Sequence, residues 1–170
     1  MTVTAVDNAV TDGFDRTEAA GWGSAPSGQA WTIFGGNGSG SVGSGVGVLS
    51  VSALPGNAYA VLDLETSATD IEMQFRTPVI PTGADRHIYL LACYDPIAFT
   101  WYALAVTITT GATLVTRIET GSPDFTVLAP NTVVPGITVV PGVWYRARFR
   151  VQGGRLAGKV WADGAPEPAS

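Results

Sequence analysis

Residues 144–161 read WYRARFRVQGGRLAGKVW, and this stretch decides the fold class. In its first half, apolar and aromatic side chains at every second position alternate with arginines, which is the period of a half-buried strand. Its second half is another strand-like run, and the Gln-Gly-Gly sequence between them is typical of a turn. The stretch predicts a β-hairpin that places Arg146, Arg148 and Arg150 on one face.

The rest of the chain continues this pattern. In residues 70–77, apolar side chains alternate with charged and amide side chains, and in residues 100–109 aromatic and β-branched residues dominate. No window of eleven residues keeps a helical apolar period free of Gly and Pro. Residues 21–47 suggest a loop or short strands anchored by aromatics, and residues 122–142 are too rich in Pro and Gly to predict a strand. Further strands are expected over 47–54, 58–64, 86–94, 113–119 and 155–161.

About nine short strands separated by turn signals predict an all-β, two-sheet antiparallel sandwich or jelly roll with little or no helix. The length of 170 residues is ordinary for one such domain. Cys93 lies in a strand-like run, where it is expected to be a small buried hydrophobe.

The composition excludes several functions. The net charge is −5 and the chain has one lysine, so no basic stripe is available for nucleic acid or an anionic membrane surface. One histidine, His87, and one cysteine make neither a His/Cys zinc site nor a disulfide. No apolar run approaches the length of a membrane span, and the first residues carry no signal-peptide pattern.

Three stretches resemble a known family. DGFDRTEAAGWGSAPSGQAWTIFGG near the start, RHIYLLACYDPIAFTWYALAV in the middle and VWYRARFRVQGGRLAGKVWADGAPEP near the end look like a concanavalin A-like (laminin G-like) jelly-roll domain. Such domains occur in tail and other structural proteins of actinobacteriophages and in secreted actinobacterial proteins. The resemblance covers roughly residues 12–168. It implies an N-terminal arm over 1–11 and a jelly-roll domain over 12–170.

The chain departs from the family after APEPAS, where domains of this type continue with another strand or two that pair beside the first strand. The resemblance therefore implies a domain that lacks its last strands and leaves an open edge near residues 12–17. An open edge is a template for pairing with another chain. We expect a neighbouring chain or a longer parent protein to supply the missing strand, as in a homo-oligomer such as a trimer.

Carboxylate pairs are the first candidate for chemistry, because glycanases share this jelly roll. Retaining glycanases need two carboxyl groups about 5 Å apart. Asp63 with Glu65, and Asp70 with Glu72, have alternate spacing on a strand, but neither pair has the family's Glu-x-Asp-x-x-Glu cluster. A solvated sheet face is the favoured interpretation, and no catalytic residue is predicted.

Carbohydrate binding is the second candidate. Aromatic side chains can stack on sugar rings, although in a sandwich they more often belong to the core. Trp101 and Tyr102 are adjacent in a predicted strand and must point to opposite faces, so at most one is buried in the core. The arginine row could bind anionic sugars, or could pair with carboxylates such as Glu119 or Asp70. The candidate residues are Trp101, Tyr102, Tyr94, Arg146 and Arg148, with Trp22 and Trp31 also available.

Calcium is the third candidate, and no other cofactor is expected. Lectin-like sandwiches often bind this ion through loop oxygens, and Asp12, Asp15 and Asp95 lie at turn-like positions. The alternative is that these aspartates cap turns. His87 would need a partner Ser or Cys motif to act as a general base, and a packed or solvated histidine is the simpler interpretation.

The sequence and the resemblance together predict a non-enzymatic structural and adhesion module of a phage virion, of the minor tail or tail-fibre type. Its partners would be other virion chains and a host-surface glycan, and it would assemble in the host cytoplasm. The alternative is a carbohydrate-binding module of a secreted actinobacterial glycan-active enzyme. A glycanase is a third, weaker hypothesis.

Overall fold

The computed structural model describes residues 9–53, 56–62, 70–95, 97–98, 100–121 and 125–169. These residues form eleven strands and no helix, which confirms the predicted all-β class. They divide into two compact units, Met1–Glu65 and Thr66–Ser170. The sequence predicts one domain over 12–170, whereas the contacts divide that range at residue 65.

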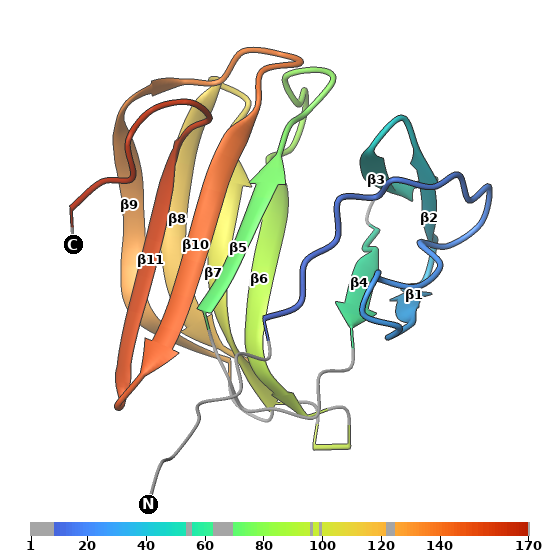
Figure 1. Ribbon diagram of the computed structural model, residues 1–170. Helices are drawn as coiled ribbons and strands as arrows, with labels where there is room; N and C mark the ends of the chain where they lie inside the picture. Colours follow the sequence, from blue (N-terminus) through green and yellow to red (C-terminus); the bar gives the residue numbers. More distant parts are fainter. Residues whose placement is uncertain are drawn as a thin grey trace, which may run out of the picture. The chain divides into compact units, whose positions relative to one another are not determined.

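The second unit is a β-sandwich of a four-stranded and a three-stranded antiparallel sheet (Figure 1). The chain enters through β5, crosses to the meander β6-β7-β8-β9, and returns to form the hairpin β10-β11 beside β5. The expected hairpin partner of β7 is β8, as predicted. The bounds are β5 Asp70–Phe75, β6 Arg86–Asp95, β7 Thr100–Ile108, β8 Thr113–Thr120, β9 Thr126–Thr138, β10 Tyr145–Gln152 and β11 Arg155–Ala162.

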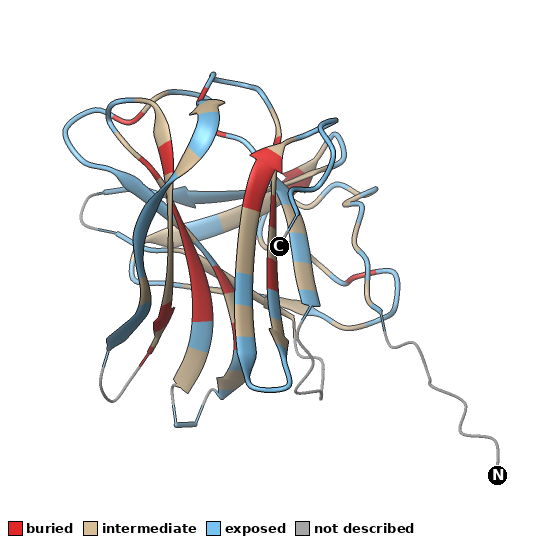
Figure 2. Cartoon of the chain, turned by 90° about the vertical axis from the view of Figure 1, so that its left-hand side faces the viewer, coloured by how far each residue is buried: buried red, intermediate tan, exposed pale blue. Residues whose placement is uncertain are grey.

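The core lies between these two sheets. Along β10, Tyr145, Ala147 and Phe149 are buried, while the arginines between them face outward. They meet buried side chains from the opposite sheet, including Leu104 and Val106 of β7. Figure 2 shows buried positions spaced along the strands of both sheets. The period-two pattern thus builds the core, as the sequence predicts.

Gly158 lies at a close contact between the two sheets. It lies opposite Phe149 on β11 and faces Leu104, which is only 1 % exposed. A Cβ atom added at Gly158 would lie 2.4 Å from Leu104 Cδ1. Because Leu104 is enclosed by the core, it has little room to retreat. The absence of a side chain at Gly158 therefore lets the sheets pack at this point.

The strand β9 was not expected from the sequence. Pro130, Pro135 and Gly136 lie within it, and these residues normally interrupt strands. The structure accommodates them through three register shifts against β8, with Gly136 at a φ of +72°. β9 stands at the end of the sheet order, where a proline without an N–H can be tolerated.

Cys93 corrects a second expectation. It is exposed rather than buried. The pairing of β6 with β7 shifts register between Ala92 and Asp95, and Cys93 adopts a φ of +53° inside that irregularity. The local change of backbone direction breaks the alternation that would have placed the thiol in the core.

The first unit contains two small antiparallel sheets. One pairs β1 (Trp31–Phe34) with β4 (Tyr59–Leu62), and the other pairs β2 (Gly38–Gly43) with β3 (Val46–Val51). Residues 12–17 form a loop and no strand, so the sheet edge expected there is not present. The described part of the chain includes no helix of the length and apolarity that a membrane crossing requires.

Replacement of Gly158 by alanine should destabilise the second unit by about 1–3 kcal/mol, because the new methyl group overpacks the inter-sheet contact with Leu104. The urea midpoint followed by circular dichroism measures this loss. Gly111→Ala is the matched control, since its nearest contact would be Thr109 Oγ1 at 3.7 Å. Equal midpoints for the two variants would contradict the proposed role of Gly158.

Candidate functional site

Two of the predicted sugar-binding aromatics line one pocket. Trp101 and Tyr102 come from the start of β7, and the pocket has a volume of about 170 Å³. The ends of the two neighbouring strands also line the pocket, because Cys93 lies near the end of β6 and Thr120 is the last residue of β8. The full lining comprises Cys93, Thr100, Trp101, Tyr102, Thr120 and Gly121.

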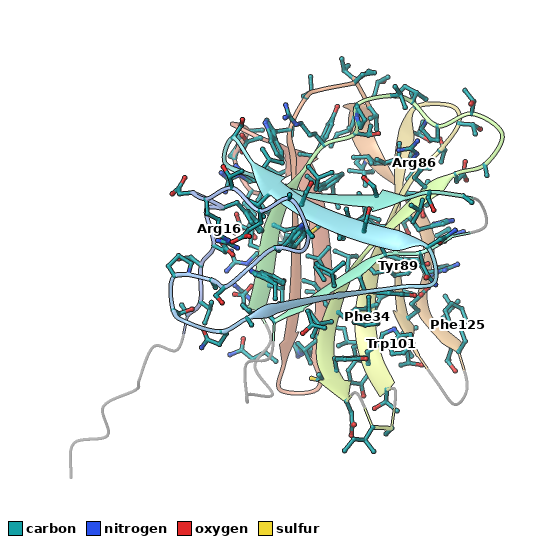
Figure 3. All side chains as sticks on the ribbon, turned by 90° about the vertical axis from the view of Figure 1, so that its right-hand side faces the viewer. Arg16, Phe34, Arg86, Tyr89, Trp101 and Phe125 are labelled. Carbon is teal, nitrogen blue, oxygen red and sulfur yellow. The ribbon has the colours of Figure 1, made fainter. Side chains whose placement is uncertain are left out.

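Backbone packing orients the indole of Trp101. Gly121 donates its N–H to the Trp101 carbonyl at 3.1 Å, so the two residues lie side by side. A Cβ atom at Gly121 would lie 2.1 Å from Trp101 Cε2, which means that the ring rests directly against the Gly121 backbone. Figure 3 labels Trp101 near one end of the sheet. Any side chain at Gly121 would displace the indole.

Tyr102 and Tyr94 differ in their relation to this pocket. Tyr102 is 38 % exposed although it has the core-facing parity of β7, because it lies at the end of the strand beyond the buried residues. Tyr94 is half-buried in the irregular end of β6 and does not line the pocket. The structure therefore brings together only Trp101 and Tyr102 among the predicted aromatics.

The arginine row lies on a different surface, the outer face of the three-stranded sheet. Arg146 donates to Glu72 at 2.7 Å and to Asp163 at 2.6 Å. Arg148 and Arg150 share the carboxylate of Asp70, at 2.6 and 2.7 Å. The predicted pairing with Asp70 is thus confirmed. Because β5 lies beside β10, its outward carboxylates face the arginines.

The suggested pairing of this row with Glu119 is wrong. Glu119 belongs to β8 in the other sheet, where it is 2 % exposed and accepts from Arg117. Arg117 also lies over the ring of Phe125, 5.4 Å from its centroid. Alternation along a strand shows which residues share a face, but it does not show which strands share a sheet.

The arginines also explain why the carboxylates make a poor acid–base pair. Hydrogen bonds from Arg148, and then from Arg150, lower the pKa of Asp70 to about 2 despite the opposing effect of its partial burial. A general acid needs a carboxyl whose pKa is raised. The structure assigns Asp70 and Glu72 to a charged sheet face, whereas Asp63 and Glu65 lie outside the described residues.

The C-terminal residues supply partners that sequence reasoning missed. Asp163 accepts from Arg146 and from Gln74, and Glu167 accepts from Arg148 at 2.9 Å and from Lys159 at 3.1 Å. These hydrogen bonds lower the pKa of both carboxyl groups. The one sign of this pairing in the sequence is the presence of acidic residues in a segment that contains Pro and Gly. The sequence does not show that the segment lies against the arginines.

Asp12, a candidate calcium ligand, organises the first unit instead. Its carboxylate accepts from both terminal nitrogens of Arg16 at 2.8 Å, from Trp31 Nε1 at 2.7 Å and from the Phe14 N–H at 2.9 Å. Arg16 also donates to the Trp22 carbonyl. These bonds, chiefly those from Arg16, lower the pKa of Asp12 to about 2.

The aromatic residues around Asp12 pack on one another. The Trp22 ring lies edge-on to Phe14 and to Trp31, with centroids 5.0 and 5.1 Å apart. Its Nε1 donates to the Val48 carbonyl at 3.0 Å. Trp22 and Trp31 therefore belong to the packed aromatic cluster of the first unit.

The other two candidate calcium ligands are not joined to Asp12. Asp95 accepts from the N–H groups of Ile97 and Ala98, which is the turn-capping arrangement that the sequence analysis offered as the alternative. Asp15 is exposed. Within the described ranges, no three His, Cys, Asp or Glu side chains are grouped so as to hold a metal ion. His87 contacts Thr107 Oγ1 through Nδ1 at 2.9 Å.

Comparison of the chain with family models, characterised proteins and solved structures finds no match.

Acidification should destabilise the first unit through Asp12. Its carboxyl has a pKa below the ordinary value of 3.8, so the stabilisation is complete above that value and is lost as the pH falls towards about 2. The urea midpoint, followed by tryptophan fluorescence between pH 6 and pH 2, measures this loss.

Asp12→Asn is the diagnostic variant. It should unfold more easily at pH 6, by about 2 kcal/mol or more, and should lose less stability on acidification than the unmodified chain. Asp15→Asn, at an exposed position in the same loop, is the control. Parallel pH profiles for Asp12→Asn and the unmodified chain would exclude Asp12 as the titrating group.

Proposed function

We propose that the chain is a non-enzymatic structural and adhesion module of a phage virion, of the minor tail or tail-fibre type, which binds host-surface glycan at Trp101 and Tyr102. The observation that carries the adhesion role is the shared aromatic pocket at the start of β7. Its lining includes two aromatic residues, a type that can stack on a sugar ring, and two threonines, whose hydroxyls are of the kind that bond sugar oxygens.

The size of the pocket limits the mode of binding. At about 170 Å³ it is smaller than the roughly 300–1,000 Å³ typical of enclosed small-molecule sites. It suits contact with one sugar ring at the end or edge of a glycan better than the burial of a long chain. Weak single-site binding of this kind becomes useful when several copies of a module act together.

The virion assignment rests on the family resemblance over residues 12–168. The same pocket also fits the alternative, a carbohydrate-binding module of a secreted actinobacterial glycan-active enzyme. Genes for tail or capsid proteins beside the coding gene would favour the virion and a cytoplasmic site of assembly. A hydrolase domain and an export signal in the parent gene would favour the secreted module.

Glycan binding is tested on an array of bacterial surface glycans. Tyr102→Ala should weaken binding roughly three- to tenfold, because it removes a stacking surface while leaving the core unchanged. Tyr89→Ala is the matched control, since Tyr89 is 39 % exposed on the same sheet and Tyr102 is 38 % exposed. Figure 3 shows Tyr89 apart from Trp101.

Binding that Tyr89→Ala and Tyr102→Ala reduce equally would place the glycan elsewhere. No binding by the unmodified chain to any glycan would overturn the adhesion role. Trp101→Ala is a second test of the pocket, and its thermal unfolding must be measured beside it because the indole packs on Gly121.

The assembly role is supported by the surface of β9, where Val127, Leu128 and Val133 are 46, 47 and 59 % exposed. An apolar strand at the end of a sheet is a suitable contact for another copy of the chain. Pro130 and Pro135 lack N–H groups, so side-chain packing would contribute more than an extended backbone ladder.

Val133→Glu should therefore shift the chain towards the monomer mass of 17.6 kDa in size-exclusion chromatography with light scattering. A buried carboxylate in the contact would be costly. Val143→Glu is the control, because Val143 is 43 % exposed and lies outside β9. An unmodified chain that is monomeric at every concentration tested would contradict assembly through β9.

A further inference from the structure

Residues 163–169, here called the C-terminal strap, fold back over the outer face of the three-stranded sheet. The strap leaves the end of β11 through a tight turn, in which Ala165 donates its N–H to the Ala162 carbonyl and Gly164 adopts a φ of +85°. In Figure 1 this red segment turns back at the end of β11. Its carboxylates then reach Arg146, Arg148 and Lys159.

The strap lies beside an aromatic residue that would otherwise face outward. Trp161 is paired with Arg146, so both side chains belong to the outer face, yet Trp161 is only 6 % exposed. Gly164 and Ala165 of the strap line a hollow together with Trp161, Glu72, Arg146 and Glu167. The small strap residues and Trp161 thus border the same hollow.

The strap also supplies carboxylates to the cations of this face. Four cations form ion pairs there, namely Arg146, Arg148, Arg150 and Lys159. The strand β5 supplies only two carboxylates to pair with them, Asp70 and Glu72. Among the side chains that form these ion pairs, Asp163 and Glu167 of the strap raise the number of carboxylates from two to four. Removal of the strap would leave the four ion-paired cations with only two carboxylates, beside a tryptophan.

The contacts that hold the strap are individually weak. In its three salt bridges the side chains are between 22 and 36 % exposed. Ion pairs in such positions are screened by water and salt, and each typically contributes about 0–1 kcal/mol. The strap is retained mainly because its covalent attachment keeps it at high effective concentration.

We propose that the C-terminal strap is a ligand held in cis, and that this face binds an extended acidic peptide segment of a partner protein when the strap is displaced. The present occupant favours a peptide because it uses a backbone group as well as its carboxylates. The Pro168 carbonyl accepts from Lys159 at 2.8 Å, beside the bond from Lys159 to Glu167. This peptide site lies on the opposite sheet from the aromatic pocket and does not depend on glycan binding.

Displacement of the strap is measured on Lys159, which is the only lysine in the chain. The rate of its acylation by an amine-reactive reagent, followed by mass spectrometry, reports how well the strap covers it. Glu167→Ala should raise this rate roughly two- to fivefold, because the carboxylate that bridges Arg148 and Lys159 is lost. Asp15→Ala, which removes one exposed carboxylate from the first unit, should leave the rate unchanged.

Binding is then tested with poly-L-glutamate as the acidic peptide. It should slow the acylation of Lys159 in the Glu167→Ala variant at low salt, and less so in the unmodified chain, where the strap competes. A second substitution, Arg148→Ala, should abolish this protection, while circular dichroism confirms that the doubly substituted chain is folded. High salt should also remove the protection.

Three results would overturn the proposal. The first is an unchanged acylation rate in Glu167→Ala, and the second is a failure of poly-L-glutamate to protect that variant. The third is protection by polygalacturonate alone, which would assign the face to an acidic glycan. The first two results do not bear on the glycan array. An acidic-glycan site on this face would be lost in Arg148→Ala and kept in Tyr102→Ala, so failure here is distinguishable from failure of the proposed adhesion role.

Discussion

The alternation of side chains along β10 is the constraint on which the second unit depends. One face of this central strand supplies Tyr145, Ala147 and Phe149 to the core, and the other supplies three arginines to the surface. A shift of one residue in its pairing would bury guanidinium groups and expose aromatic rings. The register with β5 and β11 is therefore specified by burial and by charge together.

The two units are stabilised by different kinds of packing. The sandwich buries apolar side chains from two sheets, with Phe149 and Val106 fully enclosed. The first unit has only two two-stranded sheets, which cannot form such a layer by themselves. A small aromatic cluster takes the place of a sheet-on-sheet core, and Asp12 links it to Arg16 and the Phe14 backbone. A single carboxylate thus joins three parts of the first unit, Arg16, Trp31 and the Phe14 backbone.

Local signals explain how much of this fold could be predicted. The hairpin of β10 and β11 was predicted to within about one residue at each end, because its alternation and Gly153-Gly154 turn are encoded in neighbouring residues. β9 was missed because its prolines are tolerated only at the end of a sheet, which is a property of the whole arrangement. The division at residue 65 likewise depends on contacts that no single stretch of sequence displays.

For the candidate sites too, the sequence shows which residue types lie close together along the chain, but not which distant segments contact them. Trp101 and Tyr102 were candidates because aromatic side chains can stack on sugars, but the sequence does not show that both line one pocket. The glycine against which the indole rests follows the end of β8, which is distant in the sequence. The row of arginines was visible in the sequence, whereas half of its carboxylate partners lie in a segment that resembles a linker. Since that segment neutralises the row, the same residues present a different surface when it is in place and when it is displaced. A charge pattern in a sequence therefore defines a binding surface only after every segment that can fold onto it has been located.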